Sequence, residues 1–207
     1  MHGIINIVLL LSTIVLIIVI AVMSRKHGKQ QDDINRRFLE AEEAANSVRK
    51  RELDPELFYT ADLAGLPPVP ENDPHKVLRA SKRTMIRFNS PVSNLDLKKR
   101  YGPSQMDSIA LFEENFNDYL KALTEWAASL AEEDKAGDAL LVLKQAIVLG
   151  SEFRNTYKLA ADIYAARRDT KSLDALLQYA EENYFRDPAV QNHVIEYISE
   201  KIEGLDI

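Results

Sequence analysis

The chain has 207 residues, a length that suits one domain of ordinary size or a smaller domain with attachments. A hydrophobic fraction of 46% and a charged fraction of 28% exclude a wholly disordered protein, and the lack of cysteine excludes disulfides, thiolate metal sites and a cysteine nucleophile. The net charge of −6 is uneven: residues 25–101 carry 16 Lys/Arg against 12 Asp/Glu, whereas residues 102–207 carry 10 against 20.

The uncharged N-terminal stretch predicts a transmembrane anchor at residues 1–24. Residues 3–23 include 15 Ile, Leu or Val, and a helix of that length spans roughly 31 Å, about one hydrocarbon core. A cleaved signal peptide, the alternative, would carry positive charge before its apolar run. Here the charges follow the run, at Arg25, Lys26 and Lys29. We therefore expect a single-pass protein of the cell membrane, with its N-terminus outside and its C-terminal domain in the cytoplasm.

Residues 25–54 are predicted to form a charged helical stalk. Between Gln31 and Glu52 the chain contains neither proline nor glycine. Apolar residues follow a heptad spacing there, so a weak homodimer through the stalk is an alternative to a single solvated helix. Only about two heptads are present, fewer than a coiled coil usually needs. The residues of this seam are Ile34, Phe38, Ala41, Ala45 and Val48.

Residues 55–103 read as an irregular, proline-rich connecting segment. Seven of the eight prolines lie between Pro55 and Pro103. The stretch Leu66–Pro70 should be extended, because proline fixes its own φ and biases the preceding residue away from helix. Apolar residues are interspersed with the prolines, so we expect the segment to pack on the C-terminal domain.

A cluster of basic residues lies in the second half of this segment. Three interpretations compete: a nucleic-acid patch, a contact with anionic lipid, and docking on the protein's own C-terminal domain. The strongly acidic C-terminal domain argues against nucleic acid, and the apolar residues between the charges favour docking. The cluster consists of Lys76, Arg79, Lys82, Arg83, Arg87, Lys98, Lys99 and Arg100.

From Ser104 onward the pattern predicts helices alone, so the fold class is all-α. Ser104–Asp107 has the S-x-x-D pattern of a capping box. It opens a helix to about Leu130, in which apolar residues recur at intervals of three and four. Further helices are expected over about 138–149, 153–166 and 170–184, and another begins at Asp187–Pro188.

The helical region, residues 104–207, repeats with a period of 34 residues. Alanine recurs at 127 and 161 in the first helix of each copy and at 146 and 180 in the second. This register resembles the tetratricopeptide repeat, a helix pair with large and small residues at such offsets. An unrelated helical bundle is the alternative. The residues expected to pack the repeats are Trp126, Ala127, Leu143, Ala146, Ala161, Tyr164, Leu177 and Ala180.

The resemblance covers about residues 120–187 and implies a right-handed array of antiparallel helix pairs, with the last helix as a cap. Leu173 and Ser151 depart from the family's pattern, which has a small residue and a proline there. Such arrays bind peptides or proteins in a groove lined by the first helix of each repeat. A Lys/Asn clamp for C-terminal carboxylates is not expected, because Thr124 and Ala128 stand at its positions. The groove residues would be Lys121, Thr124, Ala128, Asn155, Lys158 and Asp162.

The sequence contains no recognisable catalytic, metal or cofactor motif. The four histidines share no helical face, and no glycine-rich phosphate loop, G-x-S-x-G or H-E-x-x-H occurs. We therefore expect a non-catalytic, membrane-anchored scaffold or adaptor that binds a protein or peptide partner, without cofactor or nucleic acid. The alternative is a self-occluded structural membrane protein, in which segment 75–100 docks on its own repeat domain or on anionic lipid.

Overall fold

The computed structural model describes residues 31–73, 75–88, 90–183 and 185–205. The expected transmembrane span at 3–23 lies outside these residues, and among the described helices none combines the length and apolarity needed to cross a bilayer. The described chain is mostly helical, as the sequence predicts. Its internal contacts divide it into two units. The first holds the described residues up to Glu52 together with Ser93–Met106, and the second holds Leu53–Val92 and the chain from Asp107 onward.

The first unit joins a helix over residues 31–46 to α3 (Asn94–Tyr101). Lys98 Nζ on α3 lies 2.7 Å from Glu42 Oε2 on the other helix. Beyond residue 46 the chain leaves the helical conformation, and the Arg51 N–H donates to the Tyr101 carbonyl at 3.0 Å. The stalk helix therefore ends well before Glu52, because the backbone that follows pairs with the end of α3.

Gly102 makes the close approach between these two stretches possible. Its φ is +84°, a conformation that residues with a Cβ rarely adopt. A Cβ at this position would lie 2.9 Å from the carbonyl oxygens of both Val48 and Arg49. The glycine leads into a short 3-10 turn, η2 (Pro103–Gln105), and then into α4 (Met106–Glu132).

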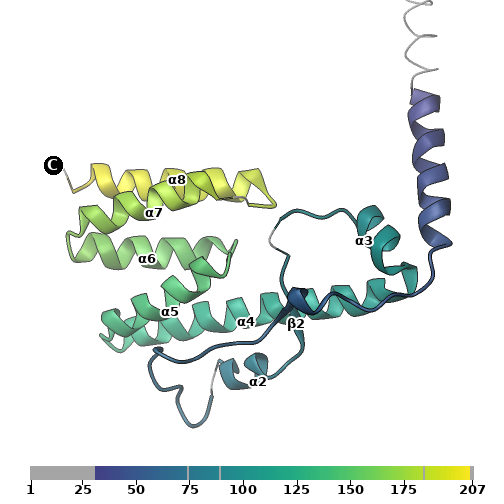
Figure 1. The fold of residues 1–207 in the computed structure, drawn as a ribbon. Coiled ribbons are helices and arrows are strands. Elements are labelled where there is room, and N and C mark those ends of the chain that lie inside the picture. Colours follow the sequence, from purple (N-terminus) through teal and green to yellow (C-terminus); the bar gives the residue numbers. More distant parts are fainter. Residues whose placement is uncertain (1–30, 74, 89, 184, 206–207) are drawn as a thin grey trace, which may run out of the picture. The chain divides into compact units, whose positions relative to one another are not determined.

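The second unit is built around a stack of helices (Figure 1). In this stack α5 packs on α6, α6 on α7, and α8 on both α6 and α7. Local signals set several helix starts: Asp169 accepts from the Ser172 N–H at α7, and Asp187 accepts from the Ala189 N–H at α8. After α4, the bounds are α5 (Ala136–Val148), α6 (Arg154–Ala166), α7 (Thr170–Glu182) and α8 (Pro188–Glu203), all close to those predicted.

Alanines at equivalent positions of the 34-residue repeat lie in the core of this stack. Ala127, Ala146, Ala161 and Ala180 are each 0% exposed. Small side chains allow neighbouring helices to approach closely, and larger ones fill the remaining volume. Of the larger residues singled out in the sequence, Trp126, Leu143 and Tyr164 are buried, whereas Leu177 is partly buried and packs against the core.

Residues 53–92 form part of the second unit's core. After a 3-10 turn, η1 (Pro55–Leu57), strand β1 (Phe58–Tyr59) pairs antiparallel with β2 (Met85–Ile86), and the short helix α2 (Val77–Ser81) lies between them in sequence. Val77 and Met85 belong to the same buried cluster as residues of α4 to α8. The segment is thus more ordered than the irregular connection that its prolines predict.

Candidate functional site

The predicted groove residues lie on α4 and α6, but not all of them face solvent. Lys121, Asn155 and Lys158 are exposed, and Ala128 is half-buried. Thr124 is only 8% exposed, and its hydroxyl donates to the Leu120 carbonyl at 3.0 Å. The side chain of Thr124 is therefore used inside the fold and does not offer its hydroxyl to a ligand.

The hydroxyl of Thr124 belongs to a buried chain of polar contacts between α4 and α6. Its oxygen lies 2.8 Å from Thr156 Oγ1, which in turn lies 3.0 Å from Ser151 Oγ. Each hydroxyl has one hydrogen to donate. Because Thr124 donates to a carbonyl, Thr156 must donate to Thr124 and Ser151 to Thr156. The arrangement satisfies all three hydroxyls, as buried polar groups require.

The side of α6 that carries Lys158 and Asp162 is contacted by α8. Asp162 accepts a hydrogen bond of 2.7 Å from the Tyr197 hydroxyl and lies 2.7 Å from Lys201 Nζ. The hydrogen bond to Asp162 raises the pKa of Lys201. Lys158 Nζ lies over the Tyr197 ring, 4.3 Å from its centroid. Within the described chain Lys158 has no carboxylate at ion-pair distance, so its charge stays available on the surface.

The predicted basic cluster is divided between the two units. Lys98, Lys99 and Arg100 form the last turn of α3 in the first unit, where Lys98 pairs with Glu42. The other five belong to the second unit: Lys76, Arg79 and Lys82 are exposed, and Arg83 and Arg87 are half-buried. The prediction that these eight residues form one cluster is therefore wrong.

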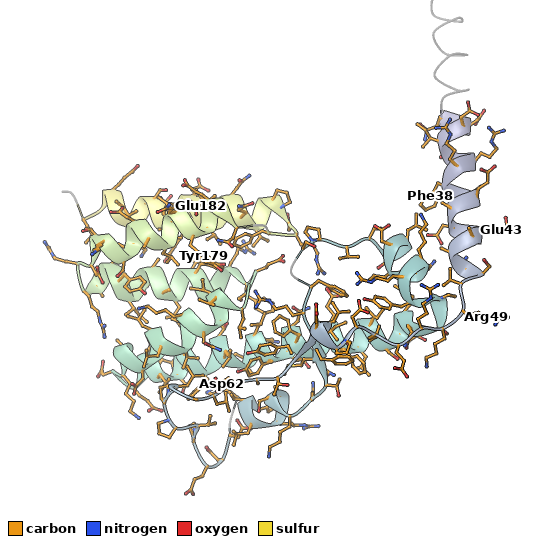
Figure 2. All side chains as sticks on the ribbon, viewed as in Figure 1. Phe38, Glu43, Arg49, Asp62, Tyr179 and Glu182 are labelled. Atoms are coloured by element: carbon orange, nitrogen blue, oxygen red, sulfur yellow. The ribbon has the colours of Figure 1, made fainter. Side chains whose placement is uncertain are left out.

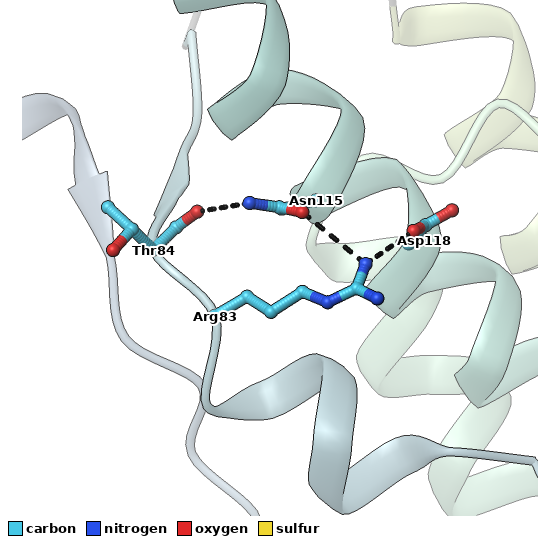
Figure 3. A network of polar contacts seen from close by, with 4 residues as sticks. All are labelled: Arg83, Thr84, Asn115 and Asp118. Carbon is cyan, nitrogen blue, oxygen red and sulfur yellow. Dashed lines mark hydrogen bonds and ion pairs between the residues drawn. The ribbon is translucent and has the colours of Figure 1, made fainter. Parts of the chain in front are cut away.

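Arg83 and Thr84 hold the basic segment on α4 (Figure 3). Arg83 Nη1 donates to Asp118 Oδ2 at 2.6 Å and more weakly to Asn115 Oδ1 at 3.4 Å. Asn115 Nδ2 donates to the Thr84 carbonyl at 2.9 Å. The ion pair is partly exposed, so it contributes about 1 kcal/mol or less. Its main effect is to fix the position of the guanidinium.

Beside this network, a half-open hollow of about 460 Å³ lies between α2 and α4. The α2 side of the wall is basic, and Lys121 adds a further cation from α4. The sequence had placed Lys121 in the groove, far from the basic segment. Of the cations on the α2 side, only Arg79 lies within α2, while Lys76 and Arg83 flank the helix, so no helical spacing in the sequence indicated this grouping. The lining residues are His75, Lys76, Arg79, Ala80, Arg83, Asp118, Lys121, Ala122 and Glu125.

Two aromatic residues place a polar atom in the core without a partner among the described residues: the Tyr119 hydroxyl and Trp126 Nε1. Burial raises the pKa of Tyr119, with smaller contributions from Tyr59 and Asp62. Burial likewise raises the pKa of Tyr157. Across the described residues no three His, Asp or Glu side chains are grouped so as to hold a metal ion. These aromatic residues belong to the core and offer no open site.

Comparison of the chain with protein-family models, with curated proteins and with solved structures finds no match.

Proposed function

We propose that the protein is a single-pass membrane protein whose tetratricopeptide-like domain acts as a non-catalytic scaffold for a protein or peptide partner. The observation that carries the proposal is the repeated use of fully buried alanines 34 residues apart, Ala127 with Ala161 and Ala146 with Ala180. Stacked helix pairs with this period form extended surfaces that suit partner binding.

The partner surface of this proposal is the exposed side of α4 and α6. It presents Lys121, Asn155 and Lys158 to solvent. Lys121 lies 3.9 Å from Glu125, a long and exposed contact that leaves its ammonium group free to exchange partners. A partner segment that supplies carboxylates or carbonyl oxygens would match these donors. The acidic balance of residues 102–207 would at the same time repel a strongly acidic partner.

The membrane part of the proposal comes from the sequence. Residues 3–23 are long and apolar enough to span a bilayer, and the basic residues Arg25, Lys26 and Lys29 follow directly. This arrangement would present the helical stack on the cytoplasmic face. A weak homodimer through the stalk belongs to the same proposal. Of the predicted seam, Ile34 and Phe38 (the latter labelled in Figure 2) are more than half exposed on the helix over 31–46, whereas Ala45 is fully buried and Val48 lies beyond the helix.

The experiment that tests this function places a photo-crosslinking amino acid at Asn155 of the full chain in native membranes. A matched variant carries it at Lys144, an exposed residue of α5. We expect a discrete adduct with a second protein from position 155 and none from position 144. Adducts of equal yield from both positions, or none from 155, would count against a groove-bound partner.

Docking of the basic segment on the protein's own repeat domain is a second candidate, favoured by one set of contacts. Arg83 pairs with Asp118, and Val77 and Met85 are buried at 0% and 1% exposed. Lys98 does not support it, because that residue pairs with Glu42. In this second candidate, residues 75–87 stay packed on the repeat domain as part of its core and do not bind lipid.

Limited proteolysis separates the two possibilities. If the segment stays docked, trypsin should cut slowly at its basic residues in the native chain. Arg83→Gln should speed the cleavage, whereas Lys82→Gln, on an exposed neighbour, should not. Cleavage between Pro70 and Pro91 as fast as in the urea-unfolded chain would mean that the segment is free.

A further inference from the structure

The hollow between α2 and α4 carries an excess of positive charge. Four of its lining residues are Lys or Arg and two are Asp or Glu, a difference of +2 when His75 is left out of the count. A concave surface with a net positive charge raises the local concentration of anionic ligands. The positive charges are therefore gathered around one hollow and are not spread over the surface.

The two carboxylates of the hollow already have cationic partners. Asp118 pairs with Arg83 at 2.6 Å, and Glu125 lies 3.9 Å from Lys121. In the described chain, neither Lys76 nor Arg79 has a carboxylate within ion-pair distance. The uncompensated charge therefore rests on these two residues: Lys76 directly precedes α2, and Arg79 lies within that helix.

We propose that this hollow binds a phosphomonoester, a function beyond that of the partner-binding scaffold. A phosphomonoester carries about −1.5 to −2 charge near pH 7, which matches the excess of two positive charges. A carboxylate would neutralise only one of them. The Arg79 guanidinium can bind two phosphate oxygens as a fork, while Lys76 and Lys121 act as point charges. Arg83 is already paired with Asp118, so it shapes the wall and adds little net charge.

Two sources can supply this chemistry, a lipid headgroup and a small soluble metabolite. Phosphatidic acid presents a phosphomonoester at a membrane surface, and glycerol 3-phosphate is its soluble counterpart. The test uses the full chain in nanodiscs of phosphatidylcholine and measures amide hydrogen exchange. In one arm glycerol 3-phosphate is titrated, and in the other phosphatidic acid is included in the nanodisc. We expect slower exchange over residues 75–83 and 118–125 in at least one arm, and the responding arm identifies the source.

Substitutions show whether the hollow itself binds the ligand. Arg79→Gln and Lys121→Gln each remove an exposed charge from its wall and should weaken the apparent affinity about tenfold or more. Lys82→Gln removes an exposed charge next to α2 that does not line the hollow, and should change the affinity less than about twofold. Trp126 fluorescence verifies that the variants are folded. No protection in either arm, unchanged affinity in both wall variants, or equal weakening by Lys82→Gln would overturn the proposal.

Discussion

Thr124 on α4 and Thr156 on α6 share a hydrogen bond of 2.8 Å between hydroxyls that are both buried. A polar contact thus joins the two helices inside an otherwise apolar interior. Ser151, just before α6, donates to the same Thr156 oxygen. Because a buried hydroxyl without a partner is costly, this chain of contacts fixes how α4 and α6 pack.

Thr156→Val should destabilise the second unit by about 1–3 kcal/mol, because it leaves Ser151 without its acceptor and Thr124 without its donor. Thr156→Ser keeps the hydroxyl and should cost less than the valine variant. Urea unfolding of the full chain in detergent, followed by the fluorescence of Trp126, the single tryptophan, measures the difference. If valine is tolerated as well as serine, the buried polar chain does not stabilise the fold.

Ala146→Leu should destabilise the same unit by about 1–3 kcal/mol, because the added carbons overpack a position that is 0% exposed. Ala110→Leu makes the same change at an exposed position of α4 and should stay within about 0.5 kcal/mol of the wild type. Thermal unfolding by circular dichroism measures both. Equal effects of the two substitutions would contradict the close packing assigned to the repeat alanines.

Gly102→Ala should loosen the first unit. Its φ of +84° is unfavourable for alanine, and the new Cβ would lie 2.9 Å from two backbone carbonyl oxygens. We expect a loss above about 1 kcal/mol, seen as faster tryptic cleavage at Arg49 and Arg51. Gly137→Ala is the matched control: its Cβ would meet only the tip of Arg167 at 3.8 Å, so it should be neutral or slightly stabilising. Unchanged cleavage in the Gly102 variant would refute the close approach.

High pH should unfold the second unit through its buried tyrosines. Burial raises the pKa of Tyr119 and of Tyr157 above the value of about 10 in the unfolded chain. The folded state then holds these protons more tightly, so the stabilisation is complete below pH about 10 and is lost as the pH rises further. The Lys201 pKa, raised by Asp162, acts in the same direction.

Tyr119→Phe isolates one of these groups. It removes a buried hydroxyl that has no hydrogen-bond partner in the described chain, so the variant should be at least as stable as the wild type at pH 7. Above pH 10 its stability should fall less steeply. The measurement is the urea midpoint by circular dichroism from pH 7 to 11.5. A steeper fall in the variant, or a large loss at pH 7, would be inconsistent with an unpaired and buried phenol.

The helical half of the fold was predictable because its signals are local. Asp187–Pro188 marks the start of α8 by capping and by proline geometry. The 34-residue recurrence of alanine placed four residues that the structure buries completely. A helix cap can be recognised from a few neighbouring residues, and the buried alanines can be recognised because they recur at a fixed interval in the sequence.

The remaining features depend on contacts between distant residues. Tyr59 pairs with Met85 across two strands of two residues each, which are too short for any periodicity to appear in the sequence. Arg83 meets Asp118 from 35 residues away. The tetratricopeptide register predicts Thr124 for the groove, but the structure buries it. Its hydroxyl is satisfied in the interior by the Leu120 carbonyl of the same helix and by Thr156 from another helix, and the second of these contacts cannot be read from local sequence.

The hollow between α2 and α4 escaped prediction for the same reason. Lys121 and Lys76 come from different helices, and the sequence assigned them to different surfaces. Their proximity depends on the way residues 53–92 fold back on α4, which the prolines alone do not specify.

The position of the helical stack relative to the membrane is the central proposal, and one labelling measurement tests it directly. The chain contains no cysteine, so Asn155→Cys introduces a single thiol at an exposed position of α6. An impermeant maleimide is added to intact cells and, separately, to permeabilised cells, and the membrane fraction is then collected. The account predicts that the protein is found in that fraction and is labelled only after permeabilisation. Labelling in intact cells, or recovery of the full chain in the soluble fraction, would contradict it.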